Sequence, residues 1–513
     1  MKTWITLGVS ALALAACSGG SAQSGAEDTS LNRSAKLPVQ AEDSYYVSAA
    51  RAVAARKDRD PVPSAKNVII FVGDGMGIST ITAGRIFTGQ QKGVDGESYQ
   101  LAMDSLPYSA FSKTYSHNSQ VSDSASTATA LVAGVKANSR TLGVTQDVPF
   151  RDCDSQKENT VDTLFELAED AGLATGIIST ARITHATPAS TYANAASRDW
   201  EDDGDLPEGA DCIDIARQLV EWPAGDGFEI AFGGGRQHFL PESVADIEDE
   251  GRTGNRSDGR NLYETWGGKS NNHLIVQTQN DFEAIDWTTD PKVLGLFERS
   301  HMEFELDRVL DTGGEPALED LTEAAINRLS KDEDGYVLMV EGGRIDHAHH
   351  GGNAARALGD FAAFDAAIAK ALEMTSEDDT LIIVTADHSH TFTIAGYPVR
   401  NNPILGKVIY PTGDLARARD GKPYTTLGYS NGAGACPDTE GCVREDLTDV
   451  DTTNKDYVQQ ATVPLYSETH AGEDVAVFAR GPGAPLVSGV MEQNEIFHIM
   501  GHASGLVAPL DDE

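Results

Sequence analysis

The sequence predicts an α/β fold in which helices cover both faces of a large, mostly parallel sheet. From Asn67 onward, short apolar runs alternate with helical patterns; the runs are NVIIFVGDG, ATGIIST, FEIAFGGG, GYVLMVEGG, TLIIVTADH and DVAVFARG. Runs rich in β-branched residues between helices are typical of a parallel sheet that is buried on both faces. The 513 residues suffice for two or three average domains, or for one large α/β domain with an insertion.

Helical patterns complete this alternation. We expect helices over 124–134, 160–171, 317–330 and 353–374, and SYYVSAARAVAARK has helical character before the first strand. Residues 397 to about 463 interrupt the rhythm, because they are rich in Gly, Asn, Pro and Asp. This interval is interpreted as an insertion and not as a layer of the sheet.

The first residues, MKTWITLGVSALALAACSGG, indicate export. The apolar stretch is too short to span a bilayer permanently, so it predicts a secretory signal. Its last residues, LAAC, resemble a bacterial lipobox, which would make Cys17 the lipidated first residue of the mature protein. We therefore expect a lipoprotein signal peptide over 1–16 and a lipidated tether with an N-terminal helix over 17–62. The protein would lie in the periplasm or at the cell surface, and a lipid would be its membrane anchor.

Charge and cysteine usage restrict the partners and the compartment. Lys and Arg number 39 and Asp and Glu 79, which gives a net charge of −40 and argues against binding to nucleic acid. The acidic residues could capture cations, but a solvated surface is the interpretation we favour. Besides Cys17, four cysteines allow three pairings. The local sequence CPDTEGC favours Cys436–Cys442, which leaves Cys153–Cys212.

Residues of the kind that bind metals follow several of the apolar runs. Open α/β sheets bind ligands beyond the carboxyl ends of their strands, so we expect these side chains to converge on one crevice. They are Asp74 in the first run, Glu341, Asp346, His347, His349 and His350 in VEGGRIDHAHH, and Asp387, His388 and His390 in VTADHSH.

Their spacing predicts two zinc sites. Asp346 and His350 are four residues apart and would share a helical face, and His470 in ETH would complete a site with an open fourth position. Asp387 and His388 are adjacent after a strand, and Asp74 is the natural third ligand of a second ion. Two zinc ions about 4 Å apart would stabilise the attacking and leaving oxygens of an in-line phosphoryl displacement.

Two further features belong to this chemistry. An oxygen-only site of Asp74, Glu341 and the hydroxyl of Thr187 would suit magnesium. Ser124 in VSDSASTATA is either a helix N-cap or a nucleophile, and no GxSxG motif surrounds it. A zinc ion could hold its hydroxyl as the alkoxide, and the helix N-terminus favours negative charge at the same residue. Ser124 could therefore fill both roles.

Six segments together resemble the successive signatures of alkaline phosphatases. They are FVGDGMG, SDSASTATA, THATPASTYANAASRDW, VEGGRIDHAHH, VTADHSH and ETHAGEDVAVFARGP, in the order of that family from residue 67 to residue 482. The resemblance implies a three-layer α/β/α catalytic domain over 63–508. It also implies a homodimer in which the insertion at about 397–463 forms a crown at the two-fold interface.

The resemblance implies a role for each site residue. Ser124 would be the phosphorylated nucleophile, and Arg198 would grip two phosphate oxygens with its planar guanidinium group. Asp123 would position Arg198 and the start of the helix. One Zn²⁺ ion would be held by Asp346, His350 and His470, and a second by Asp74, Asp387, His388 and Ser124. One Mg²⁺ ion would be held by Asp74, Thr187 and Glu341.

Two histidines resemble the animal and some marine bacterial enzymes. His185 beside the magnesium site and His347 at the phosphate stand where the enterobacterial type has Asp and Lys. Because a neutral His holds phosphate less strongly than a Lys, we expect weak product binding and fast release.

A second stretch resembles a calcium-binding region of the animal enzymes. It is LFERSHMEFELDRVLDTGGEPALED, in which the carbonyl of Phe297, Glu298 and Glu315 are the candidate ligands. Glu315 replaces the usual Asp, and a solvated acidic loop is the alternative interpretation.

The resemblance thus implies hydrolysis of small phosphate monoesters to an alcohol and inorganic phosphate through a phosphoserine. A phosphodiesterase of the same superfamily is the alternative. A sulfatase would need a C/S-x-P-x-R motif, which is not found. A non-catalytic surface lipoprotein that binds metal or phosphate is a remote third possibility.

Overall fold

The computed structural model describes residues 31, 33–436 and 441–510. The predicted signal peptide, Cys17 and the tether up to residue 30 lie outside the described residues. No helix within the described ranges combines the length and apolar character that crossing a membrane requires.

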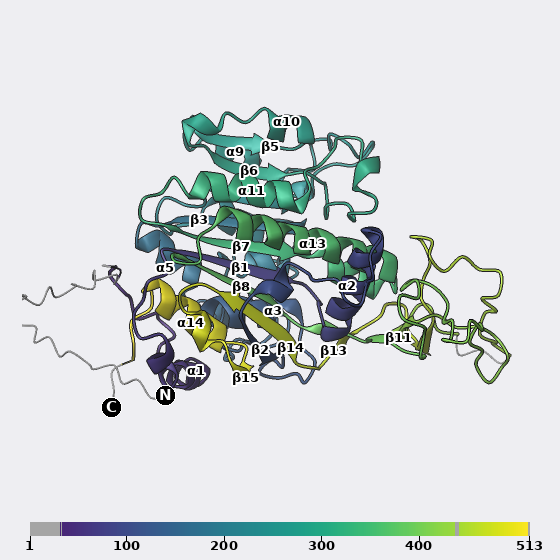
Figure 1. The fold of residues 1–513 in the computed structure, drawn as a ribbon. Coiled ribbons are helices and arrows are strands. Elements are labelled where there is room, and N and C mark those ends of the chain that lie inside the picture. The colour runs from purple at the N-terminus through teal and green to yellow at the C-terminus, as the bar shows by residue number, and fades with distance from the viewer. Residues whose placement is uncertain (1–30, 32, 437–440, 511–513) are drawn as a thin grey trace, which may run out of the picture.

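A ten-stranded sheet forms the centre of the molecule (Figure 1). In spatial order its strands are β15 (Gly489–Glu492), β2 (Tyr108–Lys113), β14 (Val475–Arg480), β8 (Thr380–Ala386), β1 (Asn67–Gly73), β7 (Tyr336–Gly342), β3 (Ala174–Arg182), β4 (Ile230–Gly234), β6 (Lys292–Leu296) and β5 (His273–Val276). Strand β14 is antiparallel to β8 and β2, whereas the other neighbouring pairs of this sheet are parallel. The predicted large, mostly parallel sheet is confirmed.

Helices cover both faces of this sheet. On β1, Val68, Ile70 and Val72 pack into one apolar core, whereas Ile69 and Phe71 pack into another. The first core includes side chains from α1 (Ser44–Ala54), α3 (Ser124–Ala133), α5 (Leu164–Asp170) and α14 (Glu495–Ser504). The second includes side chains from α2 (Ile78–Gln91), α11 (Leu318–Leu329) and α13 (Ala354–Met374). The three-layer α/β/α architecture is therefore confirmed.

The four expected helices are present, with one shifted start. Helix α5 begins at Leu164, not at 160, because the Thr163 side chain caps it and Glu166 bonds back to the Thr163 backbone. The remaining α-helices are shorter: α4 (Cys153–Gln156), α6 (Ala186–Ala189), α7 (Ile215–Val220), α8 (Arg236–Phe239), α9 (Leu262–Gly267), α10 (Gln279–Glu283) and α12 (Arg344–His350).

The described residues of the interval 397–463 contribute no strand to the central sheet. Its strands β11 (Leu427–Gly432) and β12 (Ala461–Pro464) form a separate three-stranded sheet with β10 (Phe392–Ile394). Most of this interval is irregular, and it projects from the body on the side away from α1 (Figure 1).

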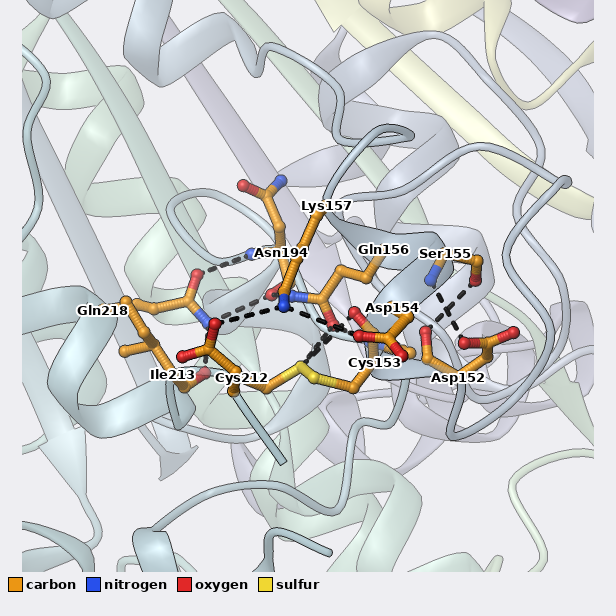
Figure 2. Close-up of a disulfide and its surroundings, with 12 residues drawn as sticks. Asp152, Cys153, Asp154, Ser155, Gln156, Lys157, Asn194, Cys212, Ile213 and Gln218 are labelled. Atoms are coloured by element: carbon orange, nitrogen blue, oxygen red, sulfur yellow. Dashed lines mark hydrogen bonds and ion pairs between the residues drawn. A yellow bond between two sulfur atoms is a disulfide. The ribbon is translucent and has the colours of Figure 1, made fainter. Parts of the chain in front are cut away.

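Both expected disulfides are present. Cys436–Cys442 closes a local loop, and Cys153–Cys212 joins segments 59 residues apart. Beside the Cys153–Cys212 bridge, Gln156 donates from Nε2 to the carbonyl of Asn194 at 2.8 Å (Figure 2). Its Oε1 accepts from the amide of Ala196 at 2.8 Å. Helix α4, which the bridge ties to Cys212, thus holds the segment that leads to Arg198 through Gln156.

Candidate active site

The crevice lies at the carboxyl edge of the central strands. Asp74 follows β1, Glu341 lies at the end of β7, Asp387 follows β8, and His185 and Thr187 follow β3. Parallel neighbours end on the same edge, so residues far apart in the sequence meet there. Helix α12 adds Asp346 and His350. Strand β13 (His470–Ala471) adds His470 by pairing with β9 (Ser389–His390).

The first cluster is formed by Asp346, His350 and His470. The Nε2 atoms of both histidines lie 3.4 Å from Asp346 Oδ1 and 3.1 Å from each other. Their Nδ1 atoms contact backbone carbonyls, that of Glu468 at 2.7 Å and that of Ser122 at 2.8 Å. Each Nδ1 is therefore the protonated donor, which turns both Nε2 lone pairs towards the carboxylate. Three electron-pair donors that converge in this way suit a zinc ion.

The second cluster surrounds Ser124. His388 Nε2 lies 3.0 Å from Ser124 Oγ, 3.2 Å from Asp387 Oδ2 and 3.4 Å from Asp74 Oδ1. All four side chains are buried. The backbone amides of Gly75 and His388 donate to Asp387 Oδ1 at 3.0 and 2.8 Å and fix that carboxylate. Two carboxylates therefore meet at the imidazole that contacts the hydroxyl of the first residue of α3.

The third group is made of oxygen atoms. Asp74 Oδ2, Thr187 Oγ1 and Glu341 Oε1 are buried, and none of them has a hydrogen-bond partner within the described residues. Burial and the neighbouring carboxylates raise the pKa of Asp74 and bring that of Glu341 to about 8. Buried carboxylates of this kind need a compensating cation, and a divalent ion that prefers oxygen ligands fits.

Arg198 is held by two partners beside the nucleophile. Its Nη1 donates to Asp123 Oδ2 at 3.1 Å, and its Nη2 donates to His185 Nε2 at 2.8 Å. Asp123, and not Ser124 as expected, is the N-cap of α3, and it accepts from the amide of Ala125 at 3.3 Å. One carboxylate thus fixes both the guanidinium group and the start of the helix.

One pocket of about 340 Å³ is lined by the three residues of the first cluster, by Ser124, and by Arg198 with its two partners. A model of the alkaline phosphatase family matches residues 65–506 of the chain. The chain belongs to the alkaline phosphatase family.

Relatives in this family are similar over most of the chain. The tissue-nonspecific alkaline phosphatase of Felis catus is 44% identical over 87% of this chain and 85% of its own length. The alkaline phosphatase of Gadus morhua is 43% identical over 86% of this chain and 92% of its own length.

Solved alkaline phosphatases share the fold. That of the Antarctic bacterium TAB5 has a TM-score of 0.58 at 26% identity, covering 86% of this chain and 98% of that one. That of Thermus thermophilus has a TM-score of 0.61 at 25% identity, covering 86% and 92%. A variant of the TAB5 enzyme holds magnesium in its M3 site.

In this alkaline phosphatase family member, His347 also lines the pocket. Its ring packs on that of His301, with 4.0 Å between the centroids, and lies 5.3 Å from that of His185. Burial lowers the pKa of His347 to about 3 and that of His185 well below its usual range. Both rings are therefore neutral, and neither adds a positive charge to the phosphate position.

His390 was expected to reach the crevice without a specific role, and Glu468 was not singled out by the sequence. His390 Nε2 lies 2.7 Å from Asp346 Oδ1, and its Nδ1 lies 2.5 Å from Glu468 Oε2. This carboxylate–imidazole–carboxylate chain orients a residue of the first cluster. One indication of their position was present in the sequence, because His390 lies in the segment of His388 and Glu468 in the segment of His470.

The expected calcium ligands are only partly assembled in this alkaline phosphatase fold. The carbonyl of Phe297 accepts a hydrogen bond from Arg236 Nη1 at 2.5 Å. Glu298 groups with Glu248 and Asp311, which were not expected. Glu315 is buried, its Oε2 has no hydrogen-bond partner in the described chain, and burial and Glu298 raise its pKa.

Proposed function

We propose that this protein hydrolyses phosphate monoesters to an alcohol and inorganic phosphate, with Ser124 as the nucleophile. The observation that carries the proposal is the position of Ser124 Oγ, at the start of α3, beside His388 and Asp74 and in the pocket lined by Arg198. Membership of the alkaline phosphatase family and the names of the relatives support the same activity.

The three clusters fit the metals of this chemistry. Asp346, His350 and His470 would hold one zinc ion, and Asp74, Asp387 and His388, with Ser124, the other. Asp74, Thr187 and Glu341 would hold magnesium, with His185 beside it. The lone pairs turned towards Asp346 and the unpartnered oxygens of Asp74, Thr187 and Glu341 support this assignment. When bound, such ions stabilise negative charge on phosphoryl oxygens and lower the pKa of hydroxyl groups.

The protein's own groups then carry out two displacements. In the first, the bond between Ser124 Oγ and phosphorus forms while the ester P–O bond breaks, and the alcohol leaves with the proton released by Ser124. Arg198 binds two non-bridging oxygens, while Asp123 holds the guanidinium group in place. In the second, a water oxygen bonds to phosphorus, the bond to Ser124 breaks, and a proton of that water returns to Ser124 Oγ. Two inversions give overall retention.

Two substrates and one matched pair of variants test this proposal. Ser124→Ala should remove activity on p-nitrophenyl phosphate and prevent phosphoserine from being trapped at acid pH. Ser122→Ala is the control, because the Ser122 hydroxyl is buried nearby and has no hydrogen-bond partner in the described chain. Full activity of Ser124→Ala would refute the mechanism. A clear preference for bis(p-nitrophenyl) phosphate would instead favour a phosphodiesterase.

We further propose a calcium site formed by Glu298, Glu315 and the Phe297 carbonyl, with Glu248 and Asp311 nearby. Four acidic side chains in one region, of which Glu315 is buried with an unpartnered oxygen, support it. Calcium should raise the thermal unfolding temperature of the native protein, and Glu298→Gln should abolish that increase. An equal increase in the variant would contradict the site.

We also propose that the protein is exported and that two copies of it form a dimer. Lipidation of Cys17 would attach the protein to a bacterial membrane from the periplasmic or outer side, and the 397–463 insertion would contact a second copy as a crown. Cys17→Ser should release the protein to the soluble fraction, and sedimentation of the native chain should give a dimer mass. Membrane retention of the variant would contradict the proposed lipidation. A monomer mass would contradict the proposed dimer.

A further inference from the structure

Four residues form a cluster at the mouth of the active-site pocket: Arg140, Phe150, Arg151 and Asp199, here called the mouth cluster. Arg140 and Asp199 line the same pocket as Ser124 and Arg198. Asp199 Oδ2 lies 2.5 Å from Arg140 Nη2 and 3.7 Å from Arg151 Nη2. Both guanidinium groups lie over the ring of Phe150, at 4.8 and 5.2 Å from its centroid.

The backbone connects this cluster to the catalytic residues. The amide of Arg140 donates to Asp123 Oδ1 at 2.8 Å, and its carbonyl accepts from the amide of Arg198 at 2.9 Å. Arg140 is therefore bonded to the residue that caps the nucleophile's helix and to the residue proposed to grip phosphate.

Both arginines adopt an unfavourable backbone conformation. Their φ angles are +69° and +66°, a region that residues other than glycine rarely adopt. Such conformations persist where surrounding contacts impose them, and they concentrate at functional sites. Here the contacts are those of Arg140 with Asp123 and Arg198, and the bond from the amide of Arg151 to the carbonyl of Ala196 at 2.8 Å.

The charge of the cluster is unusual for this protein. Two arginines and one aspartate leave one positive charge at the pocket mouth, whereas the whole chain carries −40. The side chains of Arg140 and Arg151 are 51% and 60% exposed, so both can contact a ligand. Arginine binds phosphate through two parallel hydrogen bonds, and the ring of Phe150 restricts the orientation of the guanidinium planes.

We propose that Arg140 and Arg151 form a second anion subsite that favours phosphate monoesters whose alcohol carries another phosphate group. The inference rests on the proposed function, because it concerns the leaving group of that reaction. Arg198 binds the phosphoryl group that is transferred. The alcohol portion of the bound substrate extends towards the mouth cluster, which lines the same pocket. Asp199 competes with the second phosphate for both arginines.

The test compares two substrates that differ only in that phosphate, propane-1,3-diol monophosphate and propane-1,3-diol bisphosphate. The measured quantity is the ratio of their kcat/KM values, bisphosphate over monophosphate, for the metal-loaded enzyme. Either phosphate group of the bisphosphate can react, which adds a statistical factor to its kcat/KM. The factor is the same for every variant, so it cancels when the ratios of two variants are compared. Activity on the monophosphate also reports that each variant is folded.

Arg140→Gln and Arg151→Gln should each lower the ratio about threefold, and the double variant should lower it roughly tenfold. Arg140→Lys should retain part of the preference, because it keeps the charge. Asp199→Asn should raise the ratio, because it removes the competing anion. Arg260→Gln is the matched control, since Arg260 is also exposed and ion-paired, with Glu221 at 2.8 Å, but does not line the pocket. Added salt should reduce the wild-type ratio towards that of the double variant.

A double variant with the wild-type ratio would overturn the inference, even if kcat/KM had fallen equally for both substrates. Failure of the wild-type enzyme to hydrolyse either compound would instead contradict the proposed function, so the two failures are distinguishable.

Discussion

Asp346 and His390 are joined by a contact of 2.7 Å between Oδ1 and Nε2. The same Oδ1 atom also lies near His350 and His470, so His390 orients the carboxylate that three histidines share. Glu468 holds His390 from the other side and also accepts from the amide and hydroxyl of Thr391. His390 is therefore a positioning residue for the first proposed zinc site.

His390→Gln should weaken zinc retention about 10- to 100-fold, as is typical when a residue behind a metal ligand is removed. Zinc content per chain after dialysis against a weak chelator measures this, and excess zinc should restore activity. His349→Gln is the control. His349 is equally buried, but its nitrogens contact Thr80 Oγ1 at 3.0 Å and the Tyr429 hydroxyl at 2.8 Å. Equal zinc content in both variants would show that His390 does not position the site.

The double variant His185→Asp, His347→Lys should bind inorganic phosphate more tightly. A lysine would add a cationic donor where the neutral His347 ring now lines the pocket, and charge-assisted hydrogen bonds are the stronger kind. We expect the inhibition constant of phosphate to fall roughly tenfold. Product release should slow, so kcat should fall if release limits turnover. An unchanged inhibition constant would refute this explanation of weak product binding.

Replacing Cys153 and Cys212 by serine should destabilise the protein more than replacing Cys436 and Cys442. The first bridge spans 59 residues and the second only 6, so their loop-closure contributions are about 4 and about 2 kcal/mol. Urea unfolding of both variants tests this order. Loss of the first bridge should also lower activity, because it anchors the segment before Arg198. Equal midpoints would contradict the prediction.

Lys136 should make stability depend on alkaline pH. Its side chain is 1% exposed, 3.2 Å from Glu492 Oε2 and 3.4 Å from the centroid of the Tyr115 ring. Burial lowers its pKa from 10.5 to about 8, so between these values the unfolded chain binds the proton and the folded chain does not. The contribution of Lys136 to the free energy of unfolding therefore rises by roughly 3 kcal/mol as the pH increases through this range.

Lys136→Met should remove this rise in the pH dependence of the urea midpoint. Lys113→Met is the control, because Lys113 pairs with the same Glu492 and its hydrogen bond with that residue raises its pKa. A curve for Lys136→Met that is parallel to the wild type between pH 8 and 10.5 would contradict the prediction.

The sequence was sufficient to predict the strands at the centre of the sheet and the residues that follow them. Strand β1 is apolar on both faces, and Asp74 comes directly after it, so a local pattern carries the information. Strands β2, β5, β6 and β15 were missed. Strands β2, β5 and β15 lie at or near an edge of the sheet and keep partly exposed residues. Helix α2 was missed because buried residues surround it on several sides and leave no polar stripe.

Contacts made by loop residues outside the strand ends could not be predicted. Glu248 meets Glu298 and Asp311, and Glu468 meets His390, through loops that have no periodic pattern. The mouth position of Arg140 depends on a backbone bond to Asp123, 17 residues earlier. Such pairings arise from tertiary packing, whereas spacing within a strand end or a helical turn is visible in the sequence.

The place of β14 restricts when this enzyme can become active. Although β14 comes late in the chain, it lies between β8 and β2, and the element before it is β13, which carries His470. A nascent chain on the ribosome can therefore close neither its sheet nor its first ligand cluster until almost all of it has been synthesised. Proteolytic fragments that end before residue 470 should be inert for the same reason, because they lack His470.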